Sequence, residues 1–274
     1  MFETLLQPFQ FAFMANAFVI AIIISFPTAV LSCFLVLKGW SLMGDAISHA
    51  VLPGLILAYV LNIPLVIGAF LAGLVCSGTT GFISDNCRVK PDTVLGVIFS
   101  GMFGIGIVLY VKIGTSLHLD HILFGSILGI DIEEIWISAM LSAVVFLIII
   151  FRQKDFLIYT FDPIQARAVG LSVKVLRYTL LILISLTIVA TLSSVGIILS
   201  IGLLVAPGSI AFLATRNFNT MLYISVLVTI FSCLSGIYIS FFIDSAPAPT
   251  IILVLTFIFT VTFILFRKVT TTLI

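Results

Sequence analysis

Residues 12–36 read AFMANAFVIAIIISFPTAVLSCFLV, and this run decides the fold class. It carries no charged side chain and is long enough to cross a bilayer as a helix, which takes about 20 residues. Of the 274 residues, 62% are hydrophobic and 8% are charged, whereas soluble domains carry about 25% charge. Because lipid permits only helices or closed barrels, and barrel strands alternate in polarity, we predict an all-α polytopic membrane protein.

Further continuous apolar runs follow the first and predict about nine membrane-spanning helices. The expected spans lie near 12–36, 42–61, 64–83, 93–111, 134–151, 176–193, 197–214, 219–241 and 250–266. A shorter apolar piece, 119–130, predicts a re-entrant helix because it is too short to cross. Eight or ten spans stay possible if this piece crosses or one hairpin does not. We expect residues 1–274 to form a single transmembrane domain.

Basic residues predict the orientation, because cytoplasmic loops carry an excess of Lys and Arg. With nine alternating spans, one side collects Arg88, Lys90, Arg152, Lys154, Arg167, Lys174, Arg177, Arg216, Arg267 and Lys268. That side is expected to be cytoplasmic, with the C-terminus inside and the N-terminus outside. Lys112 is the one basic exception. Asp45 would then lie about one turn from the cytoplasmic end of its span.

Several functions are disfavoured by what the sequence lacks. The net charge of +1 gives no reason to expect nucleic acid as a partner. No G-x-x-x-x-G-K-[ST] loop is present, so ATP is not expected to bind by that route. H-E-x-x-H and G-x-S-x-G are absent as well. The four cysteines form no C-x-x-C pair, and three of them lie in apolar segments as expected for small buried residues.

The stretch GDAISHAVLPG, residues 44–54, places Asp45 and His49 inside an apolar run. Residues four apart share one face of a helix. An ionisable residue in a spanning helix is costly, so it indicates a functional site. The alternative is an Asp–His hydrogen bond that only helps helices to pack.

Pro53 adds a second feature to this helix, because it has no N–H to donate to the His49 carbonyl. The sequence therefore predicts a kink and a free carbonyl beside the imidazole. Carboxylate, imidazole and carbonyl ligands suit Mn²⁺, Fe²⁺ or Zn²⁺ better than Cu⁺. One helix supplies too few ligands, whereas two copies related by a two-fold axis would bring two Asp and two His.

The longest basic loop, residues 152–177, contains a pattern typical of a short helix. Asp162 fits the N-cap, Pro163 the first helical position and Gly170 the position just past the end. A helix of about two turns is marginal in water, so we expect it to pack on the membrane domain or on a soluble partner.

Two further motifs are candidates for functional sites. His118, Asp120 and His121, in HLDH on the outer side, form either a metal entry site or a polar helix start. Pro207, in LLVAPGS, either lets its span bend during transport or makes a kink tolerated for packing.

Four motifs, taken in order, resemble the metal-ion permeases of the ABC-3 family. They are GDAISHAVLPG, FDPIQARAVGL (161–171), SVGIILSIGLLVAPGSIA (194–211) and FFIDSAPAPT (241–250). LSCFLVLKGWSLMGDAISHAVLPG (31–54) and HLDHILFG (118–125) look closest to the manganese and chelated-iron import branch, with the zinc permeases as the sister branch.

The resemblance implies a permease of the bacterial inner membrane with the all-helical fold of vitamin B12 permeases. It implies two cytoplasmic ATPase subunits, a periplasmic or surface metal-binding protein and a second permease copy or close paralogue. Asp45 and His49 correspond to the family's transit site. The segment around Asp162–Gly170, with Gln165 and Arg167, corresponds to its coupling helix. No permanently bound cofactor is implied, since the metal is the cargo.

Two competing functions stay open from the sequence. A secondary transporter could drive metal with protons through Asp45 and His49. An intramembrane metalloenzyme could use them as ligands, although no nucleophile or base motif surrounds them. The sequence does not choose between manganese, iron and zinc, because these metals share ligands.

Overall fold

The computed structural model describes residues 7–89, 91–113, 125 and 127–271, and all regular elements there are helical. The elements in chain order are η1 (Gln7–Gln10), α2 (Ala12–Lys38), α3 (Ser41–Ala50), α4 (Leu52–Val60), α5 (Leu65–Asn86), α6 (Pro91–Ile113), η2 (Ile127–Gly129), α8 (Ile132–Phe151), α9 (Gln153–Phe161), α10 (Pro163–Ala168), α11 (Val173–Ala214), α12 (Phe218–Ile243) and α13 (Pro247–Thr271).

Within the described part of the chain, nine helices are long and apolar enough to cross a membrane. Each matches one predicted span within a few residues, so the all-α prediction and the count of nine are confirmed. The predicted re-entrant segment 119–130 lies mostly outside the described residues, where only the 3₁₀ turn η2 is seen in its last part.

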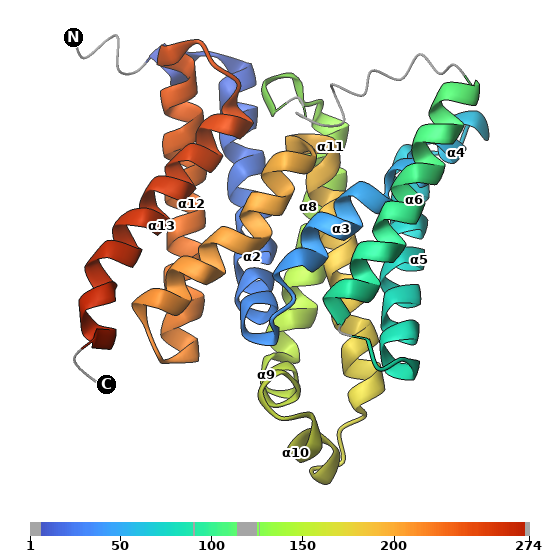
Figure 1. The fold of residues 1–274 in the computed structure, drawn as a ribbon. Coiled ribbons are helices and arrows are strands. Elements are labelled where there is room, and N and C mark those ends of the chain that lie inside the picture. Colours follow the sequence, from blue (N-terminus) through green and yellow to red (C-terminus); the bar gives the residue numbers. More distant parts are fainter. Residues whose placement is uncertain (1–6, 90, 114–124, 126, 272–274) are drawn as a thin grey trace.

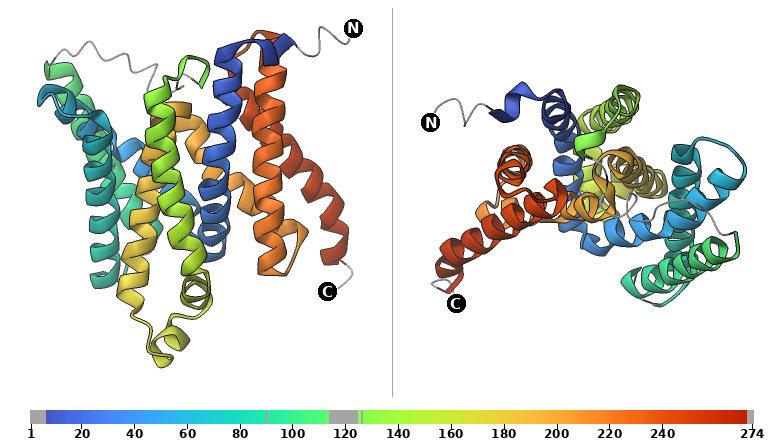
Figure 2. Two further views of the ribbon diagram at one scale, coloured as in Figure 1. Left: turned by 180° about the vertical axis from the view of Figure 1, so that it is seen from behind. Right: turned by 90° about the horizontal axis from the view of Figure 1, so that it is seen from above.

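The helices form three groups (Figures 1 and 2). Viewed from above, α2, α8 and α11 occupy the middle, α3–α6 lie to one side, and α12 and α13 lie to the other. The short α10 lies at the end of the bundle opposite the start of α2. This places the coupling segment and the basic loops together, as the charge pattern predicts.

Hydrogen bonds between spans help to hold the helices together. They matter here because in lipid no hydrophobic force drives helices to associate. The Ser225 hydroxyl of α12 donates to the Ala29 carbonyl of α2 over 2.9 Å. The Ser138 hydroxyl of α8 donates to the Ala190 carbonyl of α11 over 2.9 Å. These bonds tie the buried middle of the bundle together.

Helix α11 contains two spans, Val173–Leu192 and Ser194–Ala214, joined without a loop. The chain reverses at Gly196, whose φ of 79° lies in the region that favours glycine. Gly125 packs directly on this break, and a Cβ there would collide with the backbone of Val195 and Gly196. Gly196 is therefore required by its backbone conformation and Gly125 by the close backbone contact.

The second span does not run along the bundle axis. Gly39 ends α2 with a φ of 70°, and the chain turns there into α3. Figures 1 and 2 show α3 lying obliquely across the middle of the bundle, followed by α4 after a break at Val51. Asp45 lies about one turn after Ser41, the first residue of this span, so its predicted place along the helix agrees, and its depth in the membrane stays a prediction.

Candidate metal site and coupling segment

Asp45 and His49 lie on the same face of α3, as their spacing predicts. The His49 Nδ1 atom is 3.3 Å from Asp45 Oδ1 and 3.0 Å from the Asp45 carbonyl oxygen. Both neighbours are acceptors, so the tautomer with its proton on Nδ1 fits them, and in that tautomer Nε2 is available as a ligand. A carboxylate that orients an imidazole in this way is typical of metal-binding histidines.

Neighbouring helices contact the Asp45–His49 region of α3, and both side chains keep part of their surface exposed. Gly44 meets Leu204 of α11 on the buried face of α3. The His49 ring lies 5.6 Å from the Phe103 ring and 6.2 Å from the Phe99 ring, both on α6. The side chains of His49 and Asp45 keep 30% and 41% of their surface exposed. The pair is therefore oriented by its surroundings and still reachable by a ligand.

Asp45 opens onto a cleft of about 400 Å³ between α3, α11 and α13. Asp45 is the one charged residue of its lining, which comprises Ser41, Leu42, Asp45, Ile201, Gly202, Val205, Ala206, Ile252, Leu255 and Thr256. A cation in this cleft would meet one carboxylate in apolar surroundings, where charge attraction is strong.

The predicted kink is present, but the predicted free carbonyl is not. The break between α3 and α4 lies at Val51, two residues before Pro53. A backbone N–H at the end of α3 donates to the His49 carbonyl. The prediction of a free carbonyl oxygen is therefore wrong, because the turn at the break supplies a donor in place of Pro53.

One copy of the chain does not complete a metal site within the described residues. No group of three His, Cys, Asp or Glu side chains there could hold a metal ion. His118, Asp120 and His121 lie outside the described residues, so the predicted outer site stays a prediction. Asp45 and His49 are two side chains of ligand type, so a metal site at this pair would need further ligands.

The predicted capped helix is present as α10. The Asp162 carboxylate accepts the backbone N–H groups of Ile164 and Gln165 at 2.8 and 3.0 Å, and Pro163 is the first helical residue. Gly170 follows the helix with a φ of 86°. The helix is preceded by α9, a second short helix that sequence reasoning missed because its residues show no start signal.

The surface of α10 suits contact with another protein. Ala166 is buried against the rest of the chain, whereas Gln165 and Arg167 are exposed. Ile164 keeps 79% of its surface exposed and Val169 63%. Apolar side chains exposed beside polar ones at a projecting tip indicate a protein interface.

Pro207 interrupts the second span of α11 where α11 crosses α2. The N–H of Gly208, the next residue, donates to Ser32 Oγ of α2 over 2.8 Å. A Cβ on Gly208 would collide with the Ser32 backbone. These contacts favour the packing interpretation of Pro207, because the backbone beside it is fixed from the neighbouring helix.

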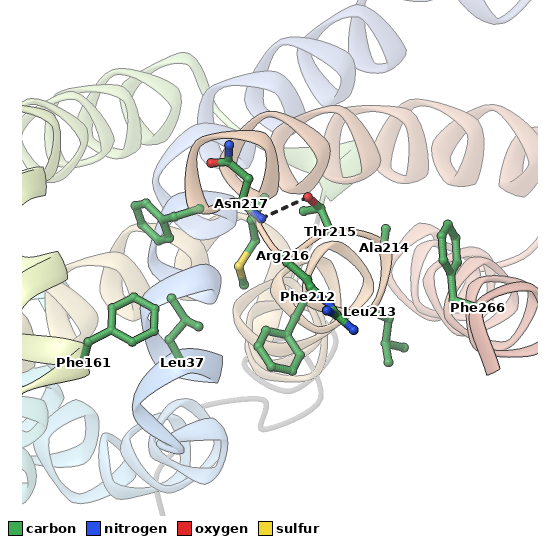
Figure 3. A pocket seen from close by; sticks show the side chains of 11 residues that line it. Leu37, Phe161, Phe212, Leu213, Ala214, Thr215, Arg216, Asn217 and Phe266 are labelled. Atoms are coloured by element: carbon green, nitrogen blue, oxygen red, sulfur yellow. Dashed lines mark hydrogen bonds between the residues drawn. The ribbon is translucent and has the colours of Figure 1, made fainter. Parts of the chain in front are cut away.

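A larger cleft, about 560 Å³, lies elsewhere, at the cytoplasmic ends of α2, α9, α11, α12 and α13 (Figure 3). Leu37, Phe161, Phe212 and Phe266 are among the apolar side chains around it, and Arg216 is its one charged residue. It offers no carboxylate or imidazole, so it does not compete with the Asp45 cleft as a metal site.

In the described part of the chain, nine spans, a charged pair in one oblique helix and a capped helix at one end define a polytopic helical membrane protein. The sequence model of the ABC 3 transport family matches residues 10–266. The chain belongs to this family and is a permease subunit, a multi-pass protein of the bacterial inner membrane.

Three known proteins are similar to this chain over most of its length. A probable iron transport system membrane protein of Haemophilus influenzae is 51% identical over 253 residues, 92% of this chain and 93% of its own. The manganese transport system membrane protein MntB of Synechocystis is 44% identical over 95% of this chain and 85% of its own. The solved structure of PsaBC from Streptococcus pneumoniae in complex with Fab matches with a TM-score of 0.86 at 33% identity, covering 96% of this chain and 95% of that one.

Proposed function

We propose that this chain is the permease of an ATP-driven importer that moves manganese, iron or both across the inner membrane. The observation that carries the proposal is the exposed Asp45–His49 pair on an otherwise apolar helix. Relatives over nearly the whole chain are named for iron and manganese transport. The family and the chemistry of the pair therefore support the same cargo.

Asp45 and His49 act in this proposal as the transit site. The Asp45 carboxylate supplies oxygen and His49 Nε2 supplies nitrogen, a set that suits Mn²⁺, Fe²⁺ and Zn²⁺. A second permease copy, or a close paralogue, would bring the same two ligands across a two-fold axis. Two carboxylates neutralise one divalent ion, which lowers the cost of its passage through a low dielectric.

The energy comes from partner subunits. The chain has no G-x-x-x-x-G-K-[ST] loop, so two separate cytoplasmic ATPase subunits hydrolyse ATP. The exposed α10, with Gln165 and Arg167, is the surface that docks on them. A periplasmic or surface metal-binding protein delivers the ion to the opposite face. ATP binding moves α10, and that movement exposes the transit site to each side in turn.

Zinc is the second candidate cargo, because the same oxygen and nitrogen ligands bind it. The ligand set alone does not separate the three metals. Competition between manganese, iron and zinc during transport would show directly which metal the chain carries.

The test is uptake by proteoliposomes that contain the complete transporter and its binding protein, with ATP enclosed. We expect uptake of manganese or iron to require ATP and to cease when the phosphate-binding lysine of the ATPase is replaced. Uptake that continues with the inactive ATPase and follows a proton gradient would overturn the proposal and indicate a secondary transporter. Preferential uptake of zinc would reassign the cargo.

A further inference from the structure

An ion pair joins two spans at the cytoplasmic end of the bundle, away from the transit site, and its Asp85 side chain is 40% exposed. Arg177, near the start of α11, binds Asp85, near the end of α5, through one guanidinium nitrogen. The Arg177 side chain is only 15% exposed. In the part of the chain that the structure describes, this is the only ion pair between two spans, since the others lie within α3 or beside α9.

The same place anchors the segment that carries α10. Lys38, the last residue of α2, donates to the Tyr159 carbonyl of α9 over 3.2 Å, and its ammonium lies 4.2 Å from the centre of the Tyr159 ring. Burial raises the pKa of Tyr159 to about 12, while Arg177 lowers it and Asp85 raises it. Helix α9 packs on both α2 and α11, and α11 packs on α5, so Lys38, Tyr159, Arg177 and Asp85 lie along one series of helix contacts, here called the basal cluster.

Helix α5 connects the basal cluster to the helices of the transit site. Gly68 of α5 and Gly54 of α4 meet backbone to backbone, and a Cβ on either would collide with the carbonyl of the other. A Cβ on Gly73 of α5 would meet Ile47 of α3, between Asp45 and His49 in sequence, and Ser185 of α11 at the same distance. Such close contact leaves α5 little freedom to slide past α3 and α4.

The Asp85–Arg177 pair also has room for a second arrangement. Arg177 Nε is buried and has no hydrogen-bond partner within the described residues. A guanidinium can bind a carboxylate through two parallel hydrogen bonds. An arrangement in which the second Asp85 oxygen also reaches Nε would satisfy this donor, so the ion pair has a second geometry to adopt when α5 and α11 move.

We propose that Asp85 and Arg177 form the link by which movement of α10 reaches α5 and, through it, the helix that carries Asp45 and His49. This inference rests on the proposed function, because it concerns how ATP hydrolysis is coupled to metal movement. Both residues are positioning residues, since neither touches the cargo.

The test measures metal ions transported per ATP hydrolysed by the complete transporter in proteoliposomes. Asp85→Asn and Arg177→Gln are each expected to lower this ratio by at least about fivefold, the lower range of coupling between sites. The charge-exchanged double variant, Asp85→Arg with Arg177→Asp, is expected to recover part of the ratio. Arg152→Gln is the matched control, because Arg152 is exposed and pairs only with Asp155, at 3.7 Å.

The ratio separates coupling from stability, because it counts only assembled complexes. An unchanged ratio in both single variants overturns the proposal, even if less protein folds. Should Arg177→Gln fail to assemble, Arg177→Lys keeps the charge and removes the Nε donor, and an unchanged ratio there overturns the proposal as well. Failure of the proposed function would appear separately, as absence of ATP-dependent metal uptake by the unaltered transporter.

Discussion

At the scale of single residues, glycines and serines set how closely the spans approach. Gly68 and Gly54 allow α5 and α4 to touch through their backbones, and Gly208 does the same for α11 on α2. The sequence did not show which glycines lie at these close contacts, because a helical glycine has the same local signature whether it faces lipid or another backbone. The pairing of Asp45 with His49 was predictable, since it depends only on helical spacing.

Gly68→Ala should destabilise the protein, because the new methyl group meets backbone that cannot move aside. Overpacking of this kind costs about 1–3 kcal/mol. Gly78→Ala, on the same helix, has open space and should be neutral or slightly stabilising. Thermal unfolding in detergent, followed by size-exclusion chromatography, compares the two. Equal midpoints would contradict the close α4–α5 contact.

Ser32→Ala should leave the Gly208 N–H without its acceptor beside Pro207. A buried donor that loses its partner costs about 1–3 kcal/mol. The control is Ser235→Ala, because Ser235 donates only to carbonyls of its own helix. A lower unfolding midpoint for Ser32→Ala than for Ser235→Ala is expected. If both variants unfold together, Ser32 does not fix the α2–α11 crossing.

At the scale of elements, the capped helix α10 was predictable and its neighbour α9 was not. The signals for α10 lie close together in the sequence, with Asp162 as the N-cap, Pro163 as the first helical residue and Gly170 just after the helix. Helix α9 instead begins at Arg152 without a side-chain cap and depends on tertiary contacts such as Tyr159 with Lys38. Local signals predict local structure, and elements held by distant contacts lack such signals.

Asp162→Ala should loosen α10, because two backbone N–H groups lose the carboxylate that binds them. Loss of an N-cap costs about 0.5–2 kcal/mol. Hydrogen exchange at the amides of Ile164 and Gln165 should accelerate, and less ATPase should copurify. Asp155→Ala removes a nearby carboxylate that caps no helix and should change neither measurement. Unchanged exchange in Asp162→Ala would refute the cap.

At the scale of the whole molecule, hydrophobicity predicted the nine spans of the described residues, and charge predicted that the basic loops and α10 lie at one end of the bundle, as in Figure 1. The oblique course of α3 and the reversal at Gly196 were not predictable, because both depend on neighbouring helices. The Asp85–Arg177 pair joins residues 92 positions apart. Each charge was visible in the sequence, but their proximity is a property of the assembled bundle.

The central prediction is that the transported metal passes Asp45 and His49. The most direct measurement is ATP-dependent manganese and iron uptake by proteoliposomes containing equal amounts of unaltered transporter, Asp45→Asn, His49→Ala and an Asp92→Asn control, whose exposed residue starts α6. Loss of one interaction with a charged group is about 1.5 kcal/mol or more, so uptake should fall at least about tenfold in the first two variants and stay unchanged in the control. Uptake at the unaltered rate by both Asp45→Asn and His49→Ala would contradict the account.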